Sequence, residues 1–261
     1  MRTNGLTTTL GQAARHVGGV LLVGMALATV FTLWTPGQVS FTDLASELSQ
    51  VINPAQSTAV APTASAATPV PTLPAEAPLI GLVAGHMGND SGAVCADGLT
   101  EAAVNLDIAI RVKAGLEANG FRVDLLDEFD GRLEGYRALA LVSIHNDSCE
   151  YINEEATGFK VAGALETGAP EKSLQLVACL TDRYHLATGM SFHEDTVTRD
   201  MTQYHSFYEI NGQTPAAIIE TGFLNLDRQI LTEQPERVAQ GIIDGIICYA
   251  RGEPVSGVTP P

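Results

Sequence analysis

Basic residues are scarce in this chain. Its 261 residues include 14 Lys and Arg against 30 Asp and Glu, which gives a formal net charge of -16 at pH 7. Binding to a phosphate backbone depends on basic side chains that displace counterions. The composition therefore excludes nucleic acid as an expected partner. No internal repeat is visible either, which excludes a repeat array.

Charge is also missing from one long stretch near the N-terminus, residues 17–34. As a helix rising about 1.5 Å per residue, this stretch would span about 27 Å, close to the hydrocarbon thickness of a bilayer. The arginines that flank this stretch, Arg2 and Arg15, are both on its N-terminal side. This arrangement is typical of an uncleaved anchor with a cytoplasmic segment at 1–16. We expect a single-pass cell-membrane anchor, with secretion after signal cleavage as the alternative. Either one places the remaining chain outside the cytoplasm.

Residues 35–78 form a juxtamembrane segment followed by a linker rich in Pro, Ala and Thr. Prolines recur from Pro54 to Pro78, so a regular element is not expected there, and the linker should be disordered and partly extended. The tail at 252–261 should be disordered as well. The remaining residues, 79–251, are expected to form one catalytic domain.

Strand and helix patterns alternate through this domain. We expect strands at 79–85, 121–126, 138–144, 158–165 and 215–220, and helices at 101–118, 132–137, 171–186 and 235–249. Near-continuous apolar runs suggest strands covered on both faces. The prediction is a single three-layer α/β domain, with a mostly parallel or mixed central sheet flanked by helices.

Four polar residues stand where an apolar strand ends or a helix begins. His86, His145 and Glu220 each follow an apolar run, and Glu101 opens a helix behind the N-cap candidate Thr100. In open α/β sheets ligands bind beyond the carboxyl ends of the strands. We therefore expect these four side chains to converge.

The residue types in this set fit a catalytic zinc centre. Three ligands, here His86, Glu101 and His145, would leave an open position for water, and Glu220 would be the carboxylate base. Each residue alone has a simpler explanation. A strand-end His is commonly a structural residue, Glu101 suits the helix dipole, and Glu220 could pair with an arginine. The combination favours Zn²⁺.

The four cysteines permit three disulfide pairings. No C-x-x-C spacing occurs, which argues against a cysteine zinc site. If the two histidines share a metal, Cys95 and Cys149 lie on adjacent loops. We then expect Cys95 to pair with Cys149 and Cys179 with Cys248, with four reduced cysteines as the alternative.

The four polar residues lie in four short motifs: GHMGNDSGA at 85–93, TE at 100–101, SIHND at 143–147 and IETGFLN at 219–225. Together these motifs resemble one enzyme family, the zinc-dependent N-acetylmuramoyl-L-alanine amidases of the type 3 catalytic domain. The resemblance covers roughly 79–251. It implies that His86, Glu101 and His145 bind zinc, that Glu220 is catalytic, and that the substrate is the amide between N-acetylmuramic acid and L-alanine of peptidoglycan.

This chain departs from the family pattern at several loop positions. Met87 stands where a Gly is common, Asn146-Asp147 replaces Ala-Asn, and Leu126-Asp127 replaces Thr-Arg. These departures touch loop packing and substrate contacts and leave the four polar positions intact. Two further residues are candidates for supporting roles in the site. Asp90 could hold His86 by a hydrogen bond, and His205 could border a substrate subsite.

The prediction from sequence is therefore an extracytoplasmic zinc amidase acting on peptidoglycan. The alternatives are a zinc peptidase acting on another peptide, and a noncatalytic wall-binding or regulatory module of the same fold. A protein activator is a further expected partner.

Overall fold

The computed structural model describes residues 76–256. The predicted anchor at 17–34 and most of the predicted linker and tail lie outside the described residues, so they stay predictions. Among residues 76–256, no helix combines the length and apolar content needed to cross a membrane.

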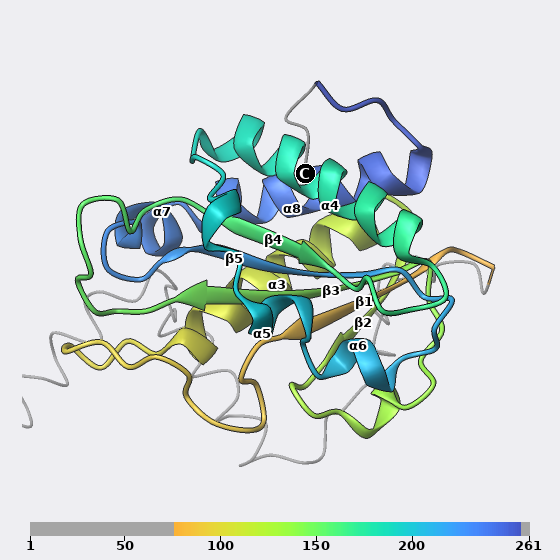
Figure 1. The fold of residues 1–261 in the computed structure, drawn as a ribbon, viewed down its shortest axis with the longest axis horizontal. Helices are drawn as coiled ribbons and strands as arrows, with labels where there is room; N and C mark the ends of the chain where they lie inside the picture. The colour runs from red at the N-terminus through yellow and green to blue at the C-terminus, as the bar shows by residue number, and fades with distance from the viewer. Residues whose placement is uncertain (1–75, 257–261) are drawn as a thin grey trace, which may run out of the picture. The chain divides into compact units, whose positions relative to one another are not determined.

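A five-stranded mixed sheet forms the centre of the described domain (Figure 1). Its spatial order is β2 (Arg122–Leu126), β1 (Leu79–Ala84), β3 (Ala140–Asp147), β5 (Ala216–Phe223) and β4 (Lys160–Gly163). The first four strands are parallel, and β4 runs antiparallel to β5. The predicted α/β class and mixed sheet are confirmed.

Helices cover both faces of this sheet (Figure 1). Long helices pack on one face around the larger apolar core: α3 (Glu101–Ala118), α4 (Pro170–Thr188) and α8 (Pro235–Arg251). The short helices α5 (Arg199–Thr202) and α6 (Ser206–Glu209) pack on the other face around a smaller core. Another short helix, α7 (Arg228–Glu233), precedes α8. The face under α5 and α6 is thus the thinner layer.

Local signals account for the bounds of α3. The Thr100 hydroxyl accepts a hydrogen bond from the Ala103 N–H at 3.3 Å, which caps the first turn. Asn119 closes the last turn, and Gly120 follows with φ of 89°. Helix α3 therefore begins at Glu101, at the edge of the sheet where β1 and β3 end.

Two predicted boundaries were wrong. Strands β3 and β5 were expected to stop at Ile144 and Glu220, but they continue to Asp147 and Phe223. The reason is that His145 and Glu220 pair in register, so the ladder of hydrogen bonds carries on past the polar residues. Both side chains project from within strands, which holds them more rigidly than a loop would.

The helix predicted at 132–137 was also wrong. Only a 3-10 turn forms there, at Gly131–Leu133. Gly135 adopts φ of 67°, a left-handed conformation that ends the helical path.

Both predicted disulfides are present, so the four-thiol alternative was wrong. Cys95 pairs with Cys149 and Cys179 with Cys248, with Cα atoms 5.2 and 5.7 Å apart. The first joins the loop before α3 to the segment after β3, and the second joins α4 to α8. These links fit an oxidising compartment.

Candidate metal and catalytic site

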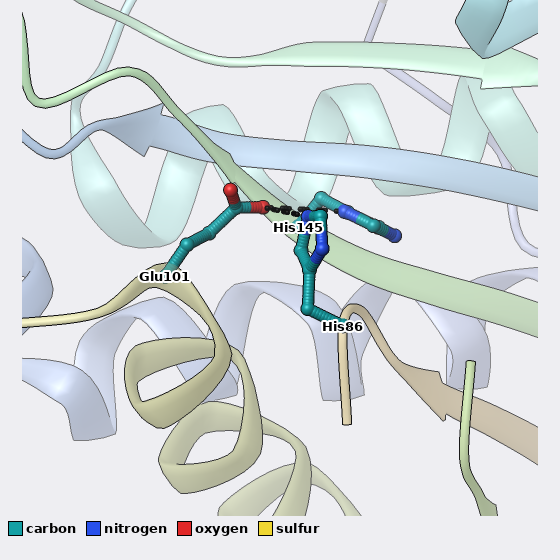
Figure 2. A group of neighbouring side chains, drawn as sticks. All are labelled: His86, Glu101 and His145. Atoms are coloured by element: carbon teal, nitrogen blue, oxygen red, sulfur yellow. Dashed lines mark hydrogen bonds and ion pairs between the residues drawn. The ribbon is translucent and has the colours of Figure 1, made fainter. Parts of the chain in front are cut away.

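The three predicted ligands meet at the carboxyl edge of the sheet. Glu101 is the first residue of α3, His145 lies in β3, and His86 follows β1 with φ of 66°. In Figure 2 both dashed lines end on one oxygen of Glu101. The convergence expected from sequence is therefore seen for these three residues.

The distances within this cluster suit a zinc ion. Glu101 Oε1 lies 3.2 Å from His86 Nε2 and 3.2 Å from His145 Nδ1, and all three candidate ligand atoms lie within 4.8 Å of one another. Ligands at about 2.0 to 2.1 Å from a tetrahedral ion are separated by about 3.3 Å. The three side chains thus fit a single zinc ion with no change of fold.

Glycines allow the ligands to approach so closely. A Cβ on Gly85 would lie 2.4 Å from the His145 ring. A Cβ on Gly92, where φ is 58°, would lie 2.6 Å from Glu101 Oε2 and 2.7 Å from the His86 ring. Contacts within the site therefore require glycine at positions 85 and 92 of this motif.

Neighbouring groups hold Glu101 ionised. Its carboxylate accepts hydrogen bonds from the Ala93 N–H at 3.1 Å and the Asn105 side chain at 3.3 Å. Burial favours the neutral acid, but hydrogen bonds from His145, His86 and Ala93 outweigh it and hold the pKa of Glu101 well below its usual range. An ionised carboxylate is the form that binds a metal.

The two further candidates also contact this region. Asp90 Oδ1 lies 2.6 Å from His86 Nδ1, an arrangement that leaves Nε2 facing Glu101. His205 Nε2 lies 2.9 Å from Glu128 Oε1. The structure thus places Asp90 in contact with the candidate ligand His86. His205 contacts Glu128, and Glu128 in turn lies beside the candidate ligand His145.

Sequence reasoning missed Glu128. This residue is 5% exposed and lies two positions beyond β2. Burial favours its neutral form, but the hydrogen bond from His205 and the charge of His145 outweigh that effect and lower its pKa to about 2. Its position after a parallel strand was a usable signal, because the carboxyl ends of such strands share one edge.

Glu220 lies on the next strand, opposite His145 in register. Its Oε2 is buried without a hydrogen-bond partner among the described residues, and no ion pair there links it to an arginine. Burial, opposed by His145 and reinforced by Asp147 and Glu101, raises the pKa of Glu220 to about 7. A carboxylate with a pKa near neutrality can both take and return a proton.

Lys160 extends this row onto β4, where it faces Glu220 in register. The lysine is 5% exposed, and its Nζ forms an ion pair with Asp147 Oδ2 at 2.5 Å. A cavity of about 380 Å³ opens beside this pair, and its lining includes Asn153, His193 and Thr198. No local sequence pattern marks this pair, because the two residues come from different strands.

The fold and this cluster define an α/β protein with a candidate metal centre. The family model for N-acetylmuramoyl-L-alanine amidase matches residues 80–248. This match spans more than half of the chain, which therefore belongs to that family.

Solved structures share the fold. The CwlD amidase of Clostridioides difficile, in complex with the GerS lipoprotein, has a TM-score of 0.54 and 22% identity, over 67% of this chain and 100% of that chain. An N-acetylmuramoyl-L-alanine amidase of Clostridium difficile 630 has a TM-score of 0.52 and 21% identity, over 68% and 99%. Ami1 of Mycobacterium smegmatis has a TM-score of 0.50 and 19% identity, over 67% and 97%. No curated protein matches this chain.

Proposed function

We propose that this protein is a zinc-dependent peptidoglycan amidase that cleaves the bond between N-acetylmuramic acid and L-alanine. The single observation that carries the proposal is the meeting of His86, Glu101 and His145 about one oxygen of Glu101, with Glu220 on the neighbouring strand. Family membership supports the substrate class.

A zinc ion held by these three residues would polarise the scissile carbonyl and make a bound water easier to deprotonate, lowering its pKa to about 7. Glu220 takes the proton from the attacking water. It then gives that proton to the nitrogen of L-alanine as the amide bond breaks. The raised pKa of about 7 suits both steps.

The peptide stem would lie on the β4 side of Glu220. The cavity of about 380 Å³ beside Lys160 has amide and hydroxyl side chains that can hydrogen-bond to a peptide backbone. The lactyl and sugar groups would then extend toward His86.

The protein would act outside the cytoplasm, held at the cell membrane by residues 17–34. The two disulfides support the compartment, and the anchor rests on the sequence alone. A protein activator remains a proposal. CwlD was solved with a lipoprotein bound, which is a reason to include candidate lipoproteins in the assay.

The test is mass spectrometry of purified peptidoglycan digested by the full chain with zinc, with a chelator, and as the Glu220→Gln variant. We expect stem peptides with a free L-alanine amine only when zinc and Glu220 are both present. Glu233→Gln, at an exposed position of α7, is the matched control. Cuts within the stem would identify a peptidase instead, and no cleavage by the folded, zinc-loaded protein would favour a noncatalytic module.

A further inference from the structure

Glu128 contacts both histidines of the candidate metal centre. Its Oε2 accepts a hydrogen bond from the backbone N–H of His86 at 2.7 Å and lies 3.5 Å from His145 Nε2. Its Oε1 accepts from the Tyr204 hydroxyl at 2.8 Å and faces His205 Nε2 at 2.9 Å. One buried carboxylate thus joins the ends of β1, β2 and β3 to the segment before α6.

The contact with His86 acts on its backbone. His86 is the only described residue other than glycine with a positive φ, 66°, and such a conformation costs energy that the surroundings must supply. The Glu128 side chain accepts from the His86 N–H, and the Glu128 N–H donates to the Met87 carbonyl at 3.0 Å. These two hydrogen bonds fix the turn that aims the His86 ring at Glu101.

The contact with His145 acts on its ring. The Nδ1 atom of His145 faces Glu101 Oε1, so in a metal-binding state the ring proton must be on Nε2. Nε2 lies 3.4 Å from the Tyr204 hydroxyl oxygen and 3.5 Å from Glu128 Oε2. An Nε2 proton therefore has acceptors nearby, whereas a bare Nε2 would face a carboxylate oxygen with no proton between them.

The hydroxyl network agrees with this placement of protons. The Ser143 hydroxyl donates to the Tyr204 oxygen at 3.0 Å, and the Tyr204 hydroxyl donates to Glu128. With its proton directed to Glu128, Tyr204 can only accept from His145. The Ser143 hydroxyl and the Nε2–H of His145 then both donate to the Tyr204 oxygen, and the Tyr204 hydroxyl donates to Glu128. Every donor in this network therefore has an acceptor.

We propose that Glu128 is a positioning residue for the metal centre, which holds the backbone turn of His86 and selects the Nε2-protonated tautomer of His145. This inference rests on the proposed zinc site. It assigns a role to a side chain outside the four motifs, and it explains why a carboxylate is buried beside two imidazoles.

The test compares two glutamates that both contact His205. Glu128 lies on its Nε2 side and touches the metal-binding histidines, whereas Glu209 lies on its Nδ1 side at 2.8 Å and touches neither. In the full chain, Glu128→Gln should raise the zinc dissociation constant about 10- to 100-fold, the range for lost outer-shell partners. Glu209→Gln should stay within about twofold of wild type in the same assay.

A second readout separates positioning from a general loss of stability. In metal-free Glu128→Gln, nitrogen NMR of the histidine rings should show a smaller fraction of His145 protonated at Nε2, the atom that faces Glu128. An unchanged tautomer and an unchanged zinc dissociation constant in a folded Glu128→Gln variant would overturn the inference.

Two further variants keep the outcome interpretable. If Glu128→Gln does not fold, Glu128→Asp decides, because the shorter side chain keeps the charge but draws the carboxylate away from the His86 N–H and His145 Nε2. Weaker zinc binding supports the inference, and wild-type binding contradicts it. His145→Ala tests the proposed site itself. If His145→Ala binds zinc as wild type does, the metal site is wrong, whereas failure of the Glu128 inference alone leaves that variant unable to bind.

Discussion

The two halves of the site differ in how completely their polar atoms are paired. On the metal side, the Glu101 carboxylate accepts from Ala93 and Asn105 and faces two imidazoles. On the base side, Glu220 Oε2 is buried with no hydrogen-bond partner in the described part of the chain. This difference is expected if the first half binds a metal ion through fixed ligands and the second half supplies the proposed base, a poorly stabilised carboxylate that is ready to accept a proton.

The largest effect should come from Glu220→Gln. The amide keeps the shape of the side chain but cannot accept a proton, so kcat on peptidoglycan should fall about 10²- to 10⁴-fold. Because a buried unpartnered charge is removed, thermal stability should be equal or higher and zinc binding should be retained. Loss of zinc in this variant would contradict the division between the two halves.

On the metal side, Gly85→Ala should weaken zinc binding. The new methyl group would lie 2.4 Å from the His145 ring and displace it. We expect destabilisation of about 1 to 3 kcal/mol and a higher zinc dissociation constant, measured by chelator competition. Gly131→Ala is the control, since a Cβ there meets nothing within 4 Å. Equal behaviour of the two variants would argue against close packing as the reason for Gly85.

The two disulfides offer a further contrast. Removing either pair by double Cys→Ser substitution should lower stability by about 2 to 4 kcal/mol. Only loss of Cys95–Cys149 should also weaken zinc binding, because that bond holds the loop that donates the Ala93 N–H to Glu101. The Cys179–Cys248 bond joins α4 to α8, and neither helix carries a residue of the candidate site. Urea unfolding and zinc titration of both variants check this.

The smallest effect concerns pH in the metal-free protein. The hydrogen bond to Glu101 is the main cause that raises the pKa of His86 from 6.5 to about 9. The resulting stabilisation is complete below pH 6.5 and is lost as the pH rises through 9. The stability difference between wild type and His86→Gln, with chelator present, should therefore shrink between these pH values. A constant difference would rule out this contact as a source of stability.

Local sequence signals correctly predicted the helix and the strands that carry the site residues. Thr100 and Asn119-Gly120 mark both ends of α3, and apolar runs locate each strand, so Glu101, His86 and His145 could be placed at one edge before the structure was known. The structure brings those three residues together. Their role as zinc ligands, like the role of Glu220, stays a prediction.

The rest of the site depends on contacts between distant segments. Glu128 and Tyr204 are separated by 76 positions. Glu128 follows a predicted strand, but no local pattern links it to Tyr204. Lys160 reads as a solvent-facing strand residue until β4 is known to lie antiparallel beside β5. Such pairings follow from the order of strands in the sheet, which one sequence does not specify.

Zinc binding by the full chain and four variants tests the central claim most directly. We expect one zinc ion per chain in the wild type and in Glu220→Gln, and loss of that ion in His86→Ala, Glu101→Ala and His145→Ala. Wild-type zinc affinity in any of these three alanine variants, each correctly folded, would contradict the proposed metal centre.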